Sequence, residues 1–207
     1  MFAWRLVPEG AWEVSSAHRR HELGYQSPLI VHTNIVIQRV RQLALEDSLP
    51  EKQQESLWLA ALWHDFGKSA RNWQDSRTTR EPWADGDVLP RHEIISAACL
   101  LASFPQLSCP AEVIARHHVE KTPDHFAGAW LPRLDEDYVA LVLGPMREAG
   151  WRSARTVSTN SFRAALRQLA GSVLAEPTSE CAALLGLLIK ADSASTFAEQ
   201  RNPALEV

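Results

Sequence analysis

Apolar side chains recur at helical spacing along most of this chain of 207 residues. Over residues 28–47, for example, Leu29, Val36, Val40 and Leu43 fall on one face, which predicts a helix that buries that face. The two-residue alternation typical of strands is nearly absent. Similar periodicity and the breaks at Gly67, Gly150 and Pro177 predict further helices over residues 51–65, 91–103, 110–119, 134–148, 160–174 and 178–198. We therefore expect an all-α helical bundle.

The length fits a single domain over residues 1–207, with a helical core over residues 28–198. Residues 1–27 lack a helical period and hold scattered Trp, Gly and Pro, so we expect a short irregular segment that packs onto the helices. Residues 69–89 are polar and predict a short helix followed by a loop, and residues 122–132 predict another loop.

Charge and cysteine content limit the function. The balance of 21 Lys and Arg against 25 Asp and Glu gives a net charge of -4, which argues against non-specific binding of polyanions by the whole surface. Cys99, Cys109 and Cys181 are widely spaced and match neither a zinc knuckle nor a disulfide framework, which favours a reducing cytoplasm. The first ten residues lack the apolar core of a signal peptide, and no apolar run reaches the ~18 residues of a membrane span. We expect a cytoplasmic protein without membrane contact.

Metal-capable side chains interrupt the apolar faces of the predicted helices. His32 lies in register with Leu29 and Val36, and Asp192 lies in register with Leu185 and Leu188. A carboxylate on a buried face is costly unless a positive group pairs with it, and one divalent cation can pair with several ligands. The candidates on or at the ends of these helices are His32, His64, Asp65, His92, His117, His118 and Asp192.

Each candidate alone has a simpler structural explanation. His32 could be a core histidine with backbone partners, Asp192 could pair with an arginine, and His92 could be a polar residue at a helix start. Their coincidence favours a metal site, because helical bundles assemble binuclear centres from inward-facing ligands on separate helices. Imidazole with carboxylate suits Mn, Fe, Co, Ni or Zn better than Ca, and seven ligands suggest two ions.

The remaining histidines and the tryptophans favour other roles. His18, His21 and His125 fall in predicted loops, where a solvated side chain is the default. The eight tryptophans are dispersed and favour packing, with Trp73 and Trp83 as the candidates for stacking on nucleic-acid bases.

The motifs carry a family resemblance. His64-Asp65 within WHDFGKSARNWQ (residues 63–74) resembles the signature of HD-superfamily metal-dependent phosphohydrolases. The longer run, HD-x-GK followed six residues later by Gln74, is similar to the HD nuclease domain of the CRISPR type I effector helicase-nuclease. RHEIISA (residues 91–97), RHH (residues 116–118) and KADSAS (residues 190–195) resemble that family's later motifs in the same order. The resemblance covers residues 28–195.

This resemblance implies an HD-domain helical bundle with two divalent transition metal ions, Mn, Fe, Co or Ni. One ion would be held by His32, His64, Asp65 and Asp192. Asp65 would bridge to a second ion held by His92, His117 and His118. Lys68 would contact the scissile phosphate or support the ligands, with a solvated lysine at a helix end as the alternative. Asp65 and Lys68 are thus the expected catalytic residues.

The implied activity is a two-metal nuclease acting on single-stranded DNA that a guide-RNA surveillance complex exposes during antiviral defence, with endonuclease and exonuclease modes both open. The sequence has no Walker-type glycine loop, so strand unwinding would need a separate helicase subunit or domain. A pair of cations can lower the pKa of a shared water and neutralise the leaving oxygen.

Two other functions remain open. A phosphohydrolase of small nucleotides would use a similar site, although VEKTPDHF after His118 contains no GYP element of the cyclic-dinucleotide branch. A non-catalytic docking module would use the metal only for folding.

Overall fold

A computed structural model of the chain describes residues 3–8, 28–70, 73, 91–118, 126, 132–151 and 157–201, without the side chains of residues 196–201. The described residues form helices and no strand, so the prediction of an all-α bundle is confirmed. The helices are α1 (Leu29–Glu46), α2 (Glu51–Trp63), the short 3-10 helix η2 (Phe66–Ser69), α4 (His92–Ser103), α5 (Ser108–Arg116), α6 (Glu136–Glu148), α7 (Thr159–Val173) and α8 (Ser179–Arg201).

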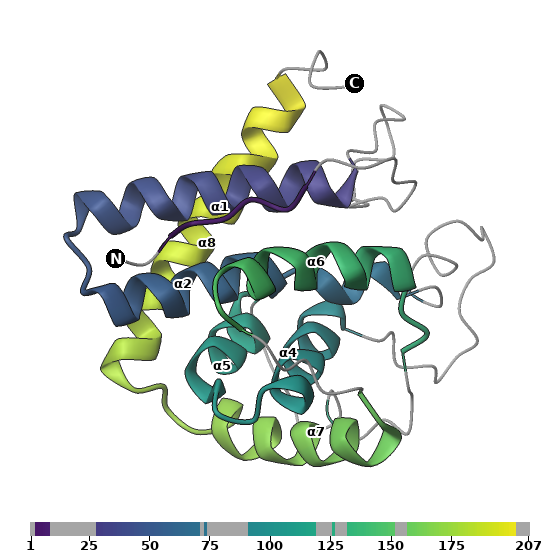
Figure 1. Cartoon of the computed structure of the whole chain (residues 1–207). Helices are drawn as coiled ribbons and strands as arrows, with labels where there is room; N and C mark the ends of the chain where they lie inside the picture. Colours follow the sequence, from purple (N-terminus) through teal and green to yellow (C-terminus); the bar gives the residue numbers. More distant parts are fainter. Residues whose placement is uncertain are drawn as a thin grey trace.

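Local sequence explains where several helices begin. Pro28 and Pro50 precede α1 and α2 in extended conformation, and a proline favours the first turn because it has no N–H to leave unpaired. Ser158 and Ser161 form a reciprocal capping box at the start of α7. The short link between α1 and α2 makes these two helices an antiparallel pair (Figure 1).

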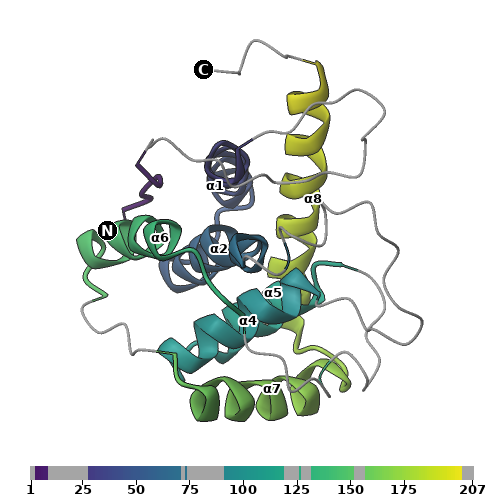
Figure 2. The ribbon, with the colours of Figure 1, turned by 90° about the vertical axis from the view of Figure 1, so that its right-hand side faces the viewer.

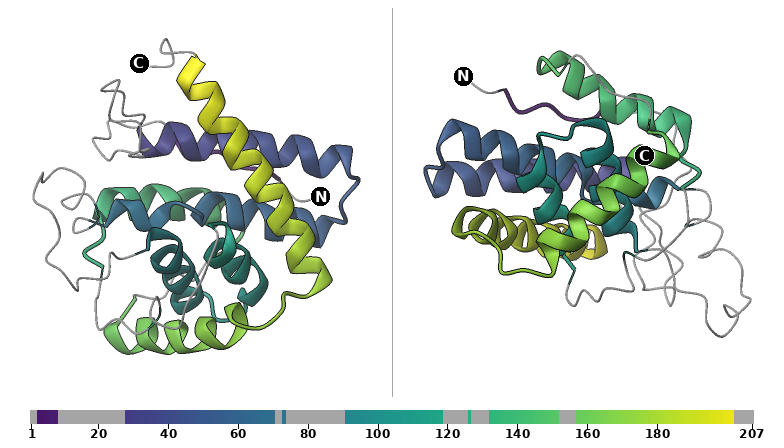
Figure 3. Two further views of the ribbon diagram at one scale, coloured as in Figure 1. Left: turned by 180° about the vertical axis from the view of Figure 1, so that it is seen from behind. Right: turned by 90° about the horizontal axis from the view of Figure 1, so that it is seen from below.

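Helix α2 is the centre of the bundle. Every side chain from Leu57 to Trp63 is buried, because α1, α5 and α8 all pack against α2. Helices α4 and α5 lie below α2, and α7 covers them from the far side (Figure 2). Seen from behind, α8 crosses α1 and α2 diagonally (Figure 3).

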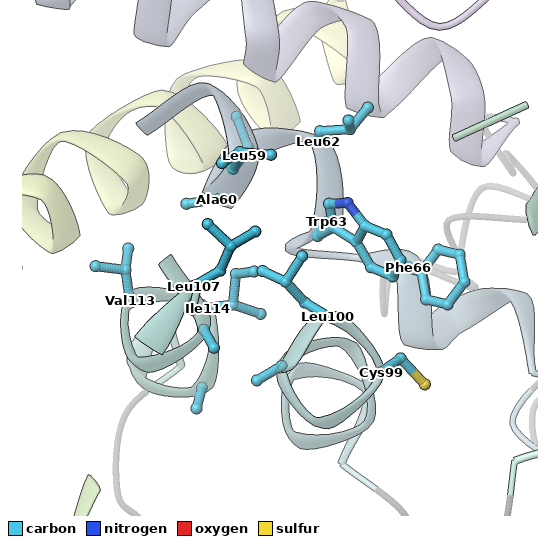
Figure 4. Packing of buried hydrophobic residues seen from close by; sticks show 14 of the residues in the cluster. Leu59, Ala60, Leu62, Trp63, Phe66, Cys99, Leu100, Leu107, Val113 and Ile114 are labelled. Atoms are coloured by element: carbon cyan, nitrogen blue, oxygen red, sulfur yellow. The ribbon is translucent and has the colours of Figure 1, made fainter. Parts of the chain in front are cut away.

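The apolar core is continuous between these layers. Leu59 and Trp63 of α2 face Leu100 of α4 and Ile114 of α5 (Figure 4). Helix α6 joins the core through Met146, whose sulfur accepts a hydrogen bond from Trp63 Nε1 at 3.1 Å. The core therefore fixes the C-terminal end of α2, which leads directly into the His64-Asp65 doublet.

The N-terminal segment packs on α1 and α2, as predicted, within residues 3–8. Asn34 exchanges two hydrogen bonds with the backbone of Val7, at 2.8 and 2.9 Å, and Trp58 Nε1 donates to Arg5 O at 2.9 Å. These residues have no regular secondary structure. The prediction for residues 9–27 falls outside the described part of the chain.

Two helix boundaries differ from the predictions. Helix α2 ends at Trp63 instead of residue 65, because the chain turns at His64 and Asp65 into η2. Helix α5 runs from Ser108 to Arg116 instead of over residues 110–119, since Pro110 sits in its first turn, where proline is tolerated. His117 and His118 consequently follow the helix instead of lying on its face.

The predicted loops at residues 69–89 and 122–132 lie outside the described residues, except for positions 69, 70, 73, 126 and 132. Across the described segments, no helix combines the length and the apolarity that crossing a membrane requires.

Candidate metal centre

The structure brings all seven predicted ligands together from five parts of the fold. They come from α1 (His32), the turn after α2 (His64 and Asp65), the start of α4 (His92), the residues after α5 (His117 and His118) and α8 (Asp192).

The first group consists of His32, His64 and Asp192. His32 Nε2 lies 3.2 Å from Asp192 Oδ1 and 3.3 Å from His64 Nε2. One ligand atom from each residue lies within 4.8 Å of the others, a spacing that a single cation could bridge.

The second group consists of Asp65, His92, His117 and His118, whose ligand atoms also lie within 4.8 Å of one another. His92 Nε2 is 3.0 Å from Asp65 Oδ1 and 3.1 Å from His118 Nε2. His117 Nε2 is 3.9 Å from the same Asp65 oxygen.

Asp65 lies between the two groups. Its Oδ1 faces the second group, whereas its Oδ2 lies 3.3 Å from His32 Nε2 and 3.5 Å from His64 Nε2. A single carboxylate thus directs one oxygen to each group, which is the arrangement of a bridging ligand.

Backbone hydrogen bonds fix two of the imidazole rings. His64 Nδ1 lies 2.7 Å from Ala61 O, and His117 Nδ1 lies 2.6 Å from Ile114 O. A carbonyl oxygen only accepts, so each Nδ1 carries a proton and donates it. Burial lowers the pKa of both rings, although Asp65 and Asp192 oppose this effect at His64. Each ring is therefore neutral and presents an unprotonated Nε2 to the site, as metal-binding histidines do.

The carboxylates are ionised despite their burial. Burial alone would raise the pKa of Asp65, but the Lys68 ammonium first, and hydrogen bonding from His32 after it, hold the pKa well below its ordinary value. At Asp192 burial likewise raises the pKa, and the hydrogen bond with His32 is the first of several opposing effects that together lower it. The site therefore combines anionic oxygens with neutral imidazole nitrogens.

Two buried atoms of this site lack a hydrogen-bond partner among the described residues. They are Asp65 Oδ1 and His117 Nε2, both lone-pair donors. The nearest described imidazole nitrogen to this Asp65 oxygen is His92 Nε2, at 3.0 Å. Burying unpaired acceptors face to face is costly, and a divalent cation would satisfy both. The donor set therefore fits a metal ion.

Lys68 is buried against Asp65. Its Nζ lies 2.6 Å from Asp65 Oδ2 and its side chain is 7% exposed, so the alternative of a solvated lysine is wrong. Buried ammonium and carboxylate groups stabilise each other, and removal of either leaves the other unpaired.

Neighbouring polar residues that the sequence did not single out support the rings. Glu93 is buried, receives a 2.7 Å ion pair from Arg91 Nε, and places its other oxygen 3.5 Å from His92 Nδ1. Ser195 Oγ lies 3.5 Å from His32 Nδ1. The sequence feature that could have identified Glu93 is a charged residue at the second position of α4, a helix that is otherwise strongly apolar.

Gly67 brings η2 against the start of α4. Its N–H donates to Ser96 Oγ at 2.7 Å, and that hydroxyl donates to His92 O at 2.8 Å. A Cβ on Gly67 would meet His92 O at 2.2 Å. This close approach places Asp65 beside the His92 ring.

Trp73 is 2% exposed and its ring packs edge-on against His92, with centroids 5.8 Å apart. The suggestion that it offers an open surface for base stacking is therefore wrong. Trp83, Gln74, His18, His21 and His125 lie outside the described residues.

Comparison of the chain with protein families, with curated proteins and with solved structures found no match.

Proposed function

We propose that this protein is an HD-type metal-dependent phosphodiesterase that cleaves single-stranded DNA, acting in CRISPR type I interference. The observation that supports it most is Asp65, a buried carboxylate with one oxygen toward each of two ligand groups. Two-metal sites of this kind serve phosphodiester hydrolysis.

The two groups define which residues would hold each cation. One cation would bind His32, His64, Asp192 and Asp65, and the other would bind Asp65, His92, His117 and His118. The mixture of imidazole and carboxylate suits Mn, Fe, Co or Ni. When bound, the cations supply a water of lowered pKa and neutralise charge on the phosphate.

The chain's own side chains prepare this site. The hydrogen bonds of His64 and His117 to backbone carbonyls aim their Nε2 atoms inward. Lys68 keeps Asp65 ionised and could reach a phosphate oxygen beside it. His92 and Asp192 are 12% and 19% exposed, whereas His32, His64 and Asp65 are at most 2% exposed. The substrate would therefore approach from the side of His92 and Asp192.

The choice of single-stranded DNA rests on the order of the motifs around His64-Asp65, His92, His117-His118 and Asp192. Bound cations would also offset the net charge of -4 locally, which makes binding of a polyanion compatible with an acidic chain. A separate helicase subunit or domain and a guide-RNA surveillance complex in the cytoplasm are the partners that belong to this proposal.

The test uses purified protein stripped with a chelator and reloaded with Mn²⁺. We expect cleavage of circular single-stranded DNA in preference to mononucleotides, with about two ions bound per chain. Asp65→Asn should lose bound metal and lower the cleavage rate by at least about 100-fold, because each ion loses a ligand. Asp47→Asn, the same change at an exposed position beyond α1, should leave both unchanged.

The second variant in this test addresses Lys68. Lys68→Met should slow cleavage while metal remains bound, with Lys52→Met at an exposed position as the control. Loss of metal instead would give Lys68 a purely structural role.

Other outcomes decide between the functions. Manganese-dependent cleavage that survives Asp65→Asn contradicts the proposed centre. A preference for nucleotides would favour a nucleotide phosphohydrolase, and metal binding without turnover would favour a docking module.

A further inference from the structure

Two cysteines that are far apart in the sequence meet at the starts of two helices. Cys109 is the second residue of α5 and Cys181 is the third residue of α8. Their positions differ by 72 in the sequence, and their sulfur atoms are 2.7 Å apart. Both are free thiols in this structure.

The geometry is close to that of a disulfide. The sulfurs of a disulfide are about 2.05 Å apart, so bond formation needs a shift of roughly 0.7 Å. Cys109 is half-buried and Cys181 is buried, so a small oxidant would reach Cys109 first. The third cysteine, Cys99, is fully buried in α4 and serves as an internal control.

We propose that Cys109 and Cys181 form a reversible disulfide that ties the start of α5 to the start of α8 when the protein meets a hydroperoxide. The Cys109 sulfur attacks the peroxide, whose O–O bond breaks to leave a sulfenic acid on Cys109 and one alcohol or water molecule. The Cys181 sulfur then attacks the sulfenic sulfur, the S–S bond forms and a second water leaves. Two thiols are oxidised and one peroxide is reduced, and an external dithiol reverses the reaction.

The environment makes this pair slow to react with weak oxidants. Burial raises the pKa of the Cys109 thiol, and Cys181, Glu180 and Glu112 raise it further. The thiolate is the reactive form, so little of it exists at neutral pH. We therefore expect the disulfide to form slowly and to need an excess of peroxide.

Both linked helices position candidate metal ligands. Helix α5 leads into His117 and His118, and α8 carries Asp192, and the two helices pack together (Figure 2). The bond would also close a loop that contains α6 and α7, which restricts the unfolded chain. Oxidation would thus stabilise the contact between α5 and α8 without adding a group to the metal centre.

The test treats the reduced, chelator-treated chain with hydrogen peroxide, alkylates the remaining thiols under denaturing conditions and maps the peptides by mass spectrometry. We expect a linked Cys109–Cys181 peptide pair, an alkylated Cys99, and a thermal midpoint raised by roughly 5–15 °C that dithiothreitol reverses. Cys99→Ala should retain the link.

Two single variants complete the test. Cys109→Ser and Cys181→Ser should lose both the link and the rise in the midpoint, and Cys181→Ser should leave a sulfenic acid on Cys109 that dimedone labels. Recovery of all three cysteines as alkylated thiols would overturn the proposal. So would oxidation of Cys109 to the sulfinic acid in the wild-type chain while Cys181 stays free.

Discussion

Asp65 is a buried carboxylate, so the site needs positive charge close to it. Its carboxylate is 2% exposed and ionised, with Lys68 2.6 Å from Oδ2, while Oδ1 has no hydrogen-bond partner among the described residues. One ammonium group therefore offsets only part of the cost of this burial. A bound cation would pair with the Asp65 Oδ1 oxygen and with the unprotonated Nε2 of His117, and these interactions would stabilise the folded chain.

Gly67 determines whether Asp65 and His92 can meet. In Gly67→Ala the new Cβ would lie 2.2 Å from His92 O, so η2 and α4 must separate. We expect a loss of about 1–3 kcal/mol in the free energy of unfolding and weaker Mn²⁺ binding, because His92 moves away from Asp65. Urea denaturation and metal titration measure the two effects.

The chain offers a matched control in α8. A Cβ on Gly186 would meet nothing within 4 Å, so Gly186→Ala should stabilise the chain by about 0.5–1 kcal/mol, as alanine does in a helix interior. A Gly67→Ala variant as stable as the wild type, with unchanged Mn²⁺ affinity, would show that the close approach is not required.

At the level of helices, local periodicity predicted the elements and their order. What it missed depends on contacts between elements. Helix α2 ends at Trp63, two residues before the predicted end, and the chain turns into η2, where Gly67 lies against the backbone of His92, a contact that the sequence does not show. Apolar periodicity continues through His64, so the sequence alone extended the helix too far.

The candidate site was predictable to a similar extent. Polar residues in register with apolar ones, such as His32 and Asp192, are visible in a sequence because they violate the helical pattern. Cys109 and Cys181 violate no pattern, and their meeting depends on how α5 packs against α8. The sequence accordingly pointed to unpaired cysteines, whereas the structure brings two of them together.

Arg116 holds the end of α5 against the end of α7. Its Nη2 donates to Ser172 O at 2.8 Å and to Ala175 O at 2.5 Å, and its Nε donates to Glu112 at 3.0 Å. A lysine keeps the charge but lacks this fork of donors. Arg116→Lys should lower the free energy of unfolding by about 1–2 kcal/mol and weaken metal binding at His117, the next residue.

The matched control is Arg167→Lys, at an exposed position on α7, which should change stability by less than about 0.5 kcal/mol. Thermal denaturation and Mn²⁺ titration of both variants separate the outcomes. Equal behaviour of the two variants would mean that the contacts between Arg116 and α7 do not position the end of α5.

Over the whole molecule, the centre joins parts of the fold that are far apart in the sequence. The ligands come from α1, the α2–η2 turn, α4, the end of α5 and α8. A ligand that binds the folded chain alone stabilises it by mass action, so a bound cation would stabilise all five parts at once. The same linkage makes the metal-free chain sensitive to protons, which compete for the same nitrogens.

The pH dependence of the metal-free chain follows from its histidines. The pKa values of His64, His92, His117 and His118 are lowered from 6.5, chiefly by burial. In the unfolded chain these rings titrate near 6.5, so below that pH the unfolded state binds more protons. The free energy of unfolding is therefore highest above pH 6.5 and falls as the pH drops, by up to about 1.4 kcal/mol per pH unit for each ring.

Protonation of the carboxylates also lowers the free energy of unfolding as the pH falls, but in a lower pH range. Asp65 and Asp192 have pKa values lowered from 3.8, so their contribution is lost only as the pH falls below that value. Urea denaturation of chelator-treated protein at pH 7.5, 6.5 and 5.5 isolates the histidines, and we expect the main loss between pH 6.5 and 5.5. His117→Gln should make this loss smaller, because one titrating ring is removed. A free energy of unfolding that is constant toward pH 5.5 would mean that these rings take up protons as readily in the folded chain as in the unfolded chain, and one that rises would mean that they take them up more readily; either result contradicts the lowered pKa values.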